Sequence, residues 1–146
     1  MRNPLASTRV RVVALLLVAV LALGALLGPG LLQRYRAREL TPVMRRYVTA
    51  AVAGDSTALE AVSATEGPVR WALQQHREHP ALLELASGRL APTVLGRMGS
   101  GAVRVHFGFA HHLVVPGCAF PYDGIYAAFR KTSTGWRLIQ AGIGPC

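Results

Sequence analysis

A long uncharged run near the N-terminus constrains this chain of 146 residues more than any other feature. From Val12 to Leu32, 21 consecutive residues lack any charged or hydrogen-bonding side chain. About 20 apolar residues, each rising roughly 1.5 Å along a helix, span a hydrocarbon core of about 30 Å. A core helix of a small domain keeps one polar face, and this run has none. The run therefore predicts a helix that inserts into a membrane.

Two kinds of membrane segment fit the run. A cleaved signal peptide has a basic start, which Arg2, Arg9 and Arg11 provide, but its apolar region is typically only about 7–15 residues long. The length therefore favours a retained signal anchor, and cleavage after about Gly24–Gly30 stays open as the alternative. Pro29, close to the end of the run, is expected to kink or stop the helix where the chain leaves the bilayer.

The chain divides around this run into a tail, an anchor, a linker and one domain. We predict a cytoplasmic N-tail over residues 1–11, a transmembrane helix over 12–32, a basic juxtamembrane linker over 33–40 and a folded domain over 41–146. Arginines lie on both sides of the run, so the positive-inside rule alone does not orient the chain in the membrane.

The two cysteines, Cys118 and Cys146, both fall in the domain. An even count in an exported domain suggests a disulfide, and two unrelated buried thiols are the alternative. A bond between them would close a loop of 29 residues and hold a C-terminus that would otherwise fray. In a chain-entropy estimate this closure contributes about 3 kcal/mol. The sequence favours the bridge, and the bridge in turn favours an extracytoplasmic domain at the cell membrane.

The net charge of +9 is unevenly distributed along the chain. Residues 1–38 hold six arginines and no acidic residue, whereas residues 39–146 hold ten basic and seven acidic residues, a net charge of +3. The excess lies at the edges of the apolar run, where anionic lipid headgroups attract basic side chains. The domain has no basic cluster interleaved with aromatic residues, as a grip on single-stranded nucleic acid would need. We therefore expect the lipid bilayer, through residues 12–32, as a partner, and no nucleic acid.

Helix signals dominate the first half of the domain. Thr41 as N-cap and Pro42 at the first helical position predict a helix that runs to Ala53, with Gly54 as its stop. Further helices are expected over Thr57–Ser63 (capped by Asp55 or Ser56), from Thr65-Glu66 to Pro80, and over Ala81–Ser87.

Strand signals dominate the second half. Ala102–Phe109 alternates between apolar and polar residues, which is typical of a strand with one buried face. A turn at Gly99–Gly101 joins it to a short strand over Thr93–Met98. The clearest pair comes last, with strands over Ile125–Lys131 and Trp136–Ile143 around a four-residue turn. Helices followed by an antiparallel meander predict an α+β fold with the helices on one face of the sheet.

The order of these elements resembles the NTF2-like (cystatin-like α+β) superfamily. The resemblance rests on the helix Pro42–Ala53, on the short helix after Gly54-Asp55 and on the C-terminal hairpin. In that hairpin, Tyr126–Lys131 followed by Gly135–Ile139 is similar to the F-x-x-x-x-G-x-W-R-I ending that is common in the superfamily. The resemblance covers residues 40–146. It implies one such domain behind an N-terminal anchor, as in exported actinobacterial proteins.

The resemblance also implies a conical pocket, which catalytic members of the superfamily line with Asp or His residues. Asp55 falls in a turn between helices and Asp123 just before a strand, and neither forms an acid–histidine pair at a spacing that the sequence supports. Aromatic residues are more often core than pocket, but they are the candidates that the sequence offers. The candidate pocket-lining residues are Trp71, His106, Tyr126 and Trp136.

The histidines and cysteines do not form a recognisable reactive site. His76 and His79 share a helix face, and zinc favours three such ligands, but Arg77 lies between them and no HExxH spacing occurs. This spacing favours the interpretation that the histidines are solvated, at a helix end and in loops. Neither cysteine has an adjacent histidine or a CxxC spacing that would make it reactive. We predict no metal, no cofactor and no catalytic residue.

These features predict a single-pass membrane protein whose extracytoplasmic domain binds an envelope protein or a small hydrophobic ligand and catalyses no reaction. The alternatives are a small pocket enzyme of the isomerase or hydrolase type and a secreted domain released by signal-peptide cleavage. A deep polar pocket with a buried carboxylate or histidine would favour the enzyme. Whether the cleft between helices and sheet is open or filled is therefore the most informative observation.

Overall fold

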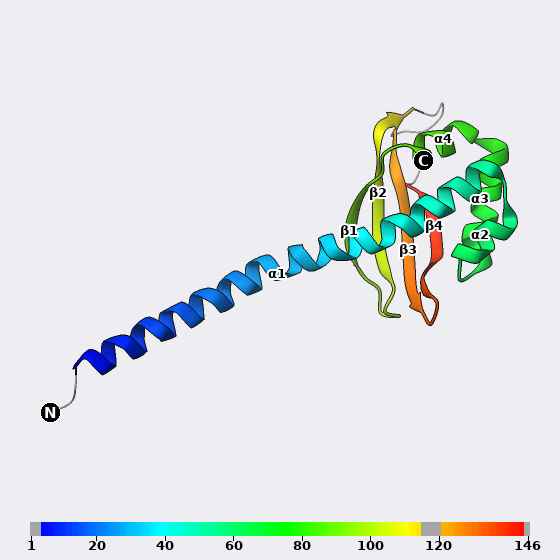
Figure 1. The fold of residues 1–146 in the computed structure, drawn as a ribbon. Coiled ribbons are helices and arrows are strands. Elements are labelled where there is room, and N and C mark those ends of the chain that lie inside the picture. The colour runs from blue at the N-terminus through cyan, green and yellow to red at the C-terminus, as the bar shows by residue number, and fades with distance from the viewer. Residues whose placement is uncertain (1–3, 115–120, 145–146) are drawn as a thin grey trace. The chain divides into compact units, whose positions relative to one another are not determined.

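The fold is α+β, as the sequence predicted. The computed structural model describes residues 4–114 and 121–144, with side chains at 12–26, 28, 35, 37–114 and 121–144. Helices come first and an antiparallel sheet follows, with strand order β1-β2-β3-β4. Figure 1 shows the elements in chain order: α1 (Pro4–Ala53), α2 (Ser56–Val62), α3 (Glu66–Glu78), α4 (Pro80–Ser87), β1 (Ala91–Arg97), β2 (Val103–Leu113), β3 (Tyr122–Thr132) and β4 (Gly135–Ile143).

The chain divides into two compact units, Met1–Tyr35 and Arg36–Cys146. The first unit contains the apolar run. Among the residues that the structure describes, no helix is both long enough and apolar enough to cross a membrane. Every side chain from Val12 to Leu26 is exposed, Leu15 to 70% and Leu26 to 79%. Apolar side chains thus lie exposed on all sides of this part of α1.

The predicted start of the domain helix at Thr41 is wrong, because α1 runs on through Pro29 and Thr41 without a break. Its predicted end at Ala53, before Gly54, is confirmed. Thr41 caps nothing: its Oγ1 donates to the carbonyl oxygen of Ala37 at 2.7 Å, as hydroxyl side chains do inside helices. Ala37 and Leu40 are already buried. The burial of these two side chains offsets the roughly 3 kcal/mol that Pro42 costs inside the helix. The helix therefore packs on the domain from a turn earlier than the sequence indicated.

The segment between α2 and α3 is tied to the edge of the sheet. Asp55 caps α2 as predicted, with Oδ1 accepting from the N–H of Ala58 at 3.0 Å. Thr65 precedes α3 but does not cap it, because its Oγ1 donates to the carbonyl oxygen of Ile139 at 3.0 Å. The N–H of Ala64 donates to the carbonyl oxygen of Leu138 at 2.6 Å. These bonds fix the ends of α2 and α3 against β4.

The sheet is a meander of neighbouring antiparallel strands. The predicted four-residue turn of the last hairpin is confirmed, with Thr132 and Gly135 paired as its first and last residues. Gly135 has φ +112°, a conformation that favours glycine. The predicted disulfide cannot be placed in this arrangement, because Cys118 and Cys146 lie outside the described residues, so it stays a prediction.

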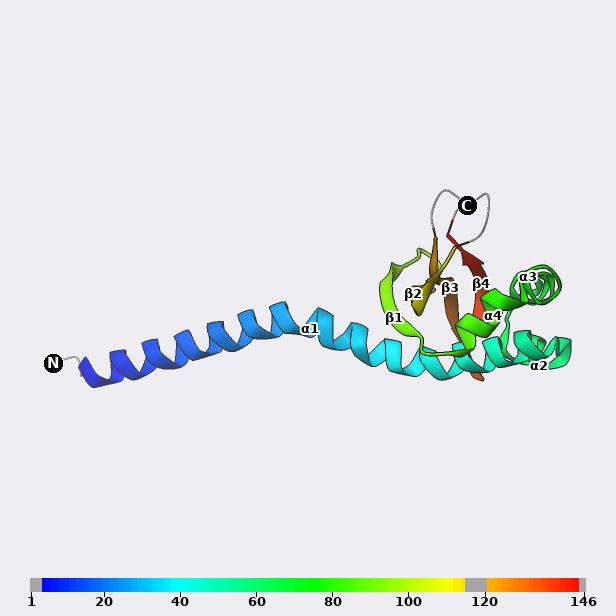
Figure 2. The same cartoon turned by 90° about the horizontal axis from the view of Figure 1, so that it is seen from above.

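The core fills the space between the helices and one face of the sheet. Figure 2 shows the last turns of α1 running along that face, with α3 and α4 beside them. Met44 and Tyr47 of α1 and Phe107 and Phe129 of the sheet are fully buried in one cluster. The rings of Phe107 and Phe129 meet edge to face with centroids 5.9 Å apart. The cleft between helices and sheet is therefore filled by packed side chains.

Tyr47 makes the fold sensitive to alkaline pH. Its hydroxyl donates to the carbonyl oxygen of Pro68 at 2.7 Å, and burial raises its pKa. The unfolded chain loses this proton at about pH 10, while the folded chain keeps it. The contribution of Tyr47 is therefore complete below about pH 10 and declines as the pH rises further, by up to about 1.4 kcal/mol per pH unit.

We expect Tyr47→Phe to lower the free energy of unfolding by about 1–3 kcal/mol at neutral pH, because the buried hydrogen bond is lost. Above about pH 10 the variant should lose less further stability than the wild type does. Urea unfolding of both proteins at neutral and alkaline pH measures the difference. Parallel losses in the two proteins would contradict the assignment to Tyr47.

Candidate functional site

Strand register gathers polar side chains on the face of the sheet that points away from the core. Because Val105 and Phe107 point into the core, Arg104 and His106 between them point the other way. Cross-strand pairing carries the alternation over β3 and on to β4. A register shift between the Ala128–Gln140 and Phe129–Leu138 pairs puts both Arg137 and Gln140 on this face. We call this surface the open face, and no described helix covers it. Its main residues are Arg104, His106, Tyr126, Ala128, Arg130, Arg137 and Gln140.

A small hollow lies at the centre of the open face. Ala128 pairs with Arg104 on one side and Gln140 on the other, so only a methyl group stands between two long polar side chains. Tyr126 and Leu95 complete the walls around about 100 Å³. Small-molecule sites usually measure roughly 300–1,000 Å³. The hollow is therefore the size of one side chain and too small for a typical metabolite.

The open face is basic, and no acidic side chain of the described residues pairs with its arginines. Arg130 and Arg137 lie directly opposite each other on β3 and β4, an arrangement that destabilises a sheet when the charges are alike. Within the described residues, the one ion pair joins His106 to Asp123. Arg104, Arg130 and Arg137 are thus available to an external anion.

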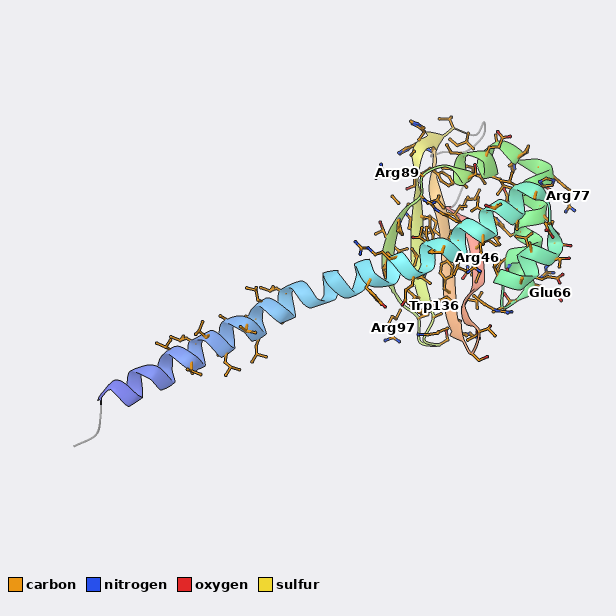
Figure 3. All side chains as sticks on the ribbon, in the orientation of Figure 1. Arg46, Glu66, Arg77, Arg89, Arg97 and Trp136 are labelled. Atoms are coloured by element: carbon orange, nitrogen blue, oxygen red, sulfur yellow. The ribbon has the colours of Figure 1, made fainter. Side chains whose placement is uncertain are left out.

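The shorter helices and the strands of the domain carry opposite net charges. Residues 55–87, which form the shorter helices, hold five acidic and two basic residues, whereas residues 91–143 hold five basic residues and one acidic residue. Figure 3 shows Glu66 on the helical side and Arg97 among the strands. An acidic molecule is therefore attracted to the strands more than to the shorter helices.

A histidine–carboxylate pair, which sequence reasoning missed, borders the open face. Nε2 of His106 lies 3.3 Å from Oδ1 of Asp123, and the His106 ring lies 4.5 Å from that of Tyr126, centroid to centroid. Gly124 leaves room for this ring, since a Cβ there would collide with Nε2 of His106 and with the Phe107 backbone. Gly108 and Gly124 were the signal that could have indicated the pair, because they pair with each other next to His106 in the strand register.

The four candidate pocket residues fall into two groups. His106 and Tyr126 lie together on the open face, and Tyr126 lines the hollow. Trp71 and Trp136 are half-buried and pack against the core instead. Trp136 lies beside α1 (Figure 3), where its Nε1 donates to Oε2 of Glu39 at 3.0 Å. The tryptophans therefore hold the layers together, and neither lines the hollow.

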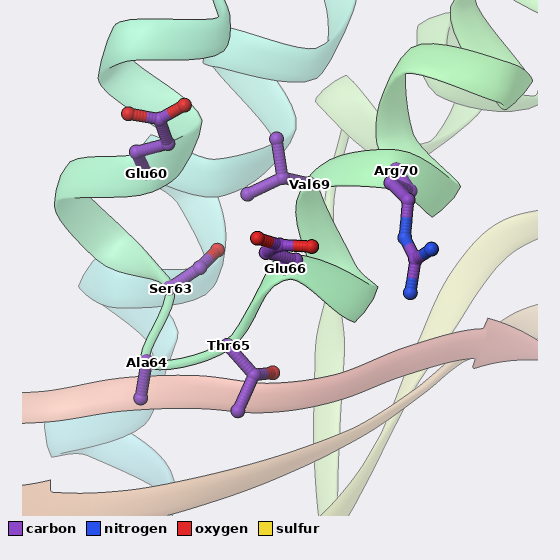
Figure 4. Close-up of a pocket in the computed structure, with 7 residues that line it drawn as sticks. All are labelled: Glu60, Ser63, Ala64, Thr65, Glu66, Val69 and Arg70. Carbon is purple, nitrogen blue, oxygen red and sulfur yellow. The ribbon is translucent and has the colours of Figure 1, made fainter.

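A larger hollow of about 570 Å³ opens between α2 and α3, away from all four candidates. Figure 4 shows the residues around it: Glu60, Ser63, Ala64, Thr65, Glu66, Val69 and Arg70. Its volume falls within the range of small-molecule sites. Sequence reasoning had no signal for it, because it depends on how the α2–α3 segment docks on β4.

No group of three metal-ligating side chains comes together anywhere in the described part of the chain. His76, His79, His111 and His112 are exposed. The basic open face and the hollow between α2 and α3 are thus candidate places for a ligand. Searches for related proteins add no assignment: no family model, no curated protein and no solved structure matches this chain significantly.

Proposed function

We propose that this chain is a single-pass membrane-anchored binding protein. Its extracytoplasmic, NTF2-like domain holds an acidic segment of an envelope protein on the open face of the sheet and catalyses no reaction. The observation that carries the proposal is the contrast between the two faces of the sheet. One face packs against the core, and the other presents three arginines that have no acidic partner among the described residues.

The anchor is supported by the sequence and by the exposure of the run. The uncharged run extends from Val12 to Leu32, and its described side chains up to Leu26 are all exposed. Monomeric soluble proteins rarely expose apolar patches larger than roughly 300–600 Å². A continuous apolar helix of this kind is stable where lipid covers it, because the helix satisfies its own backbone hydrogen bonds.

The filled cleft supports the part of the proposal that the domain catalyses no reaction. Enzymes of the superfamily that the sequence resembles work in a pocket between helices and sheet, and here Tyr47, Phe107 and Phe129 occupy that space. The His106–Asp123 pair lies on the other face, where the Asp123 side chain is 51% exposed. Such a pair is accessible to a partner but is not enclosed, as a water-excluding active site would be.

An acidic protein segment fits the open face better than other anions do. The hollow over Ala128 accepts one side chain, and Arg104 beside it can hold a carboxylate with two parallel hydrogen bonds. Tyr126 and Arg104 belong to residue types, Tyr and Arg, that are enriched among the anchors of protein interfaces. Arg130 and Arg137 lie one step further along the strands, where a second carboxylate would relieve their mutual repulsion.

Charge reversal on the open face tests this proposal. We expect Arg130→Glu with Arg137→Glu to weaken binding of a fluorescent glutamate-rich peptide at least about tenfold, or ~1.4 kcal/mol, and to reduce its salt dependence. The control is Arg45→Glu with Arg46→Glu, which changes the net charge equally on the exposed side of α1. Fluorescence anisotropy of the full chain in nanodiscs gives both affinities. Equal losses in both variants, or tighter binding to anionic vesicles than to the peptide, would contradict the proposal.

A further inference from the structure

The hollow between α2 and α3 contains a buried hydroxyl group without a partner. Ser63 is only 6% exposed, and its Oγ has no hydrogen-bond partner within the described residues. Figure 4 shows this oxygen directed into the space between the two helices, toward Glu66 and Val69. An unsatisfied buried hydroxyl costs roughly 1–3 kcal/mol. A ligand or a water that completes its hydrogen bonds would remove this cost.

The walls of the same hollow carry charges of both signs. Glu60 from α2 and Glu66 from α3 are exposed beside Ser63, and neither is in an ion pair in the described part of the chain. Arg70, one turn further along α3, is also unpaired there, and Figure 4 shows its guanidinium pointing away from Glu60. The hollow thus has an acidic side next to the buried hydroxyl and a basic side at its edge.

The opposite charges of the hollow do not neutralise one another. Glu66 and Arg70 are spaced four residues apart on α3, where opposite charges often pair, yet the structure has no ion pair between them. Thr65 is held by its bond to Ile139, so it leaves the first N–H groups of α3 uncapped. Val69 contributes an apolar wall to the hollow.

We propose that this hollow binds a small zwitterion of the amino-acid class. The ammonium group lies between the Glu60 and Glu66 carboxylates and donates a hydrogen bond to Oγ of Ser63. An ammonium carries three donors, which matches these three acceptors. The carboxylate of the ligand pairs with Arg70, and its carbon chain packs on Val69. The site shares no residue with the open face, so it does not depend on the acidic-partner proposal.

Other ligand classes match these groups less well. A simple anion could pair with Arg70 but would leave both carboxylates without a positive partner. A simple cation could pair with the carboxylates but would leave Arg70 without a negative partner. A divalent metal would need more oxygen or nitrogen ligands than two glutamates supply, and no three metal-ligating residues meet among the described residues. A zwitterion uses every charged group of the hollow with the correct sign.

Ligand-observed NMR with the full chain in lipid nanodiscs tests the proposal, with empty nanodiscs as the blank. The probes are ε-aminohexanoate and leucine, compared with hexylamine, which lacks the carboxylate, and hexanoate, which lacks the ammonium. We expect saturable binding of at least one zwitterion, at least tenfold tighter than either comparison compound. Saturable binding of neither zwitterion, or equal binding of hexylamine, would overturn the proposal.

Three variants separate the site from general charge effects. Glu60→Gln with Glu66→Gln should weaken zwitterion binding at least tenfold, whereas Glu78→Gln with Glu84→Gln, an equal change of charge elsewhere on the helices, should not. Ser63→Ala should weaken binding severalfold without lowering the thermal unfolding temperature, because the lost hydroxyl has no hydrogen-bond partner among the described residues. Binding unchanged in Ser63→Ala and in the Glu60/Glu66 variant would overturn the proposal.

Discussion

Replacing Leu17 and Leu21 by arginine is expected to move the full chain out of the membrane fraction. Both side chains are exposed on α1, to 57% and 66%, and both lie near the middle of the uncharged run. An arginine at the centre of an inserting helix costs about 2.5–3.5 kcal/mol on the insertion scale. Two such residues together cost roughly 5–7 kcal/mol, which is enough to prevent insertion.

Carbonate extraction of cell membranes measures this effect. The wild type should stay in the pellet at alkaline pH, and the double arginine variant should appear in the supernatant or be degraded. The control places two arginines on exposed apolar positions of the domain, Val52→Arg and Val114→Arg, and should stay in the pellet. A double arginine variant that resists extraction as the wild type does would refute the anchor.

The same membranes test cleavage and sidedness. N-terminal sequencing of the mature chain distinguishes a retained anchor from a signal peptide cut after about Gly24–Gly30. Protease added to intact spheroplasts should digest the domain if it is extracytoplasmic, and protection from the protease would place it in the cytoplasm. A faster-migrating band without reductant would support the bridge between Cys118 and Cys146.

Local signals were enough to predict most elements of the domain. Asp55 ends up as the cap of α2, and the alternation of Ala102–Phe109 appears as the buried and exposed faces of β2. Both features are determined by residues close to one another in the sequence, so the sequence pattern reports them. The start of the first domain helix was wrong because it depends on tertiary burial of Ala37 and Leu40, which a Thr-Pro signal does not report.

The candidate sites depend on contacts that the sequence pattern does not encode. His106 meets Asp123 only because β2 and β3 pair in one particular register and Gly124 leaves space for the ring. The hollow at Ser63 exists because Ala64 and Thr65 bond to the edge of β4, more than 70 residues away in the chain. Of the four aromatic and histidine candidates, only His106 and Tyr126 share a surface, because the tryptophans are used for packing.

The loss of an aromatic ring is expected to destabilise the fold much more on the core face of the sheet than on the open face. Phe107 is fully buried against Phe129, so Phe107→Ala should lower the free energy of unfolding by about 3–5 kcal/mol. In a domain of this size each 1 kcal/mol corresponds to roughly 4–8 °C in unfolding temperature. Tyr126, 37% exposed on the open face, should cost only about 1 kcal/mol when replaced by alanine.

Binding should show the reverse order. Below its unfolding temperature, Phe107→Ala should bind the glutamate-rich peptide as the wild type does, because its side chain lies on the other side of the sheet. Tyr126→Ala should bind it severalfold more weakly, because it opens one wall of the hollow beside Arg104. Thermal unfolding and anisotropy on the same preparations give both quantities. If Tyr126→Ala destabilised the fold as much as Phe107→Ala, the open face would have to be buried in the intact protein, and the proposal that a separate partner binds there would fail.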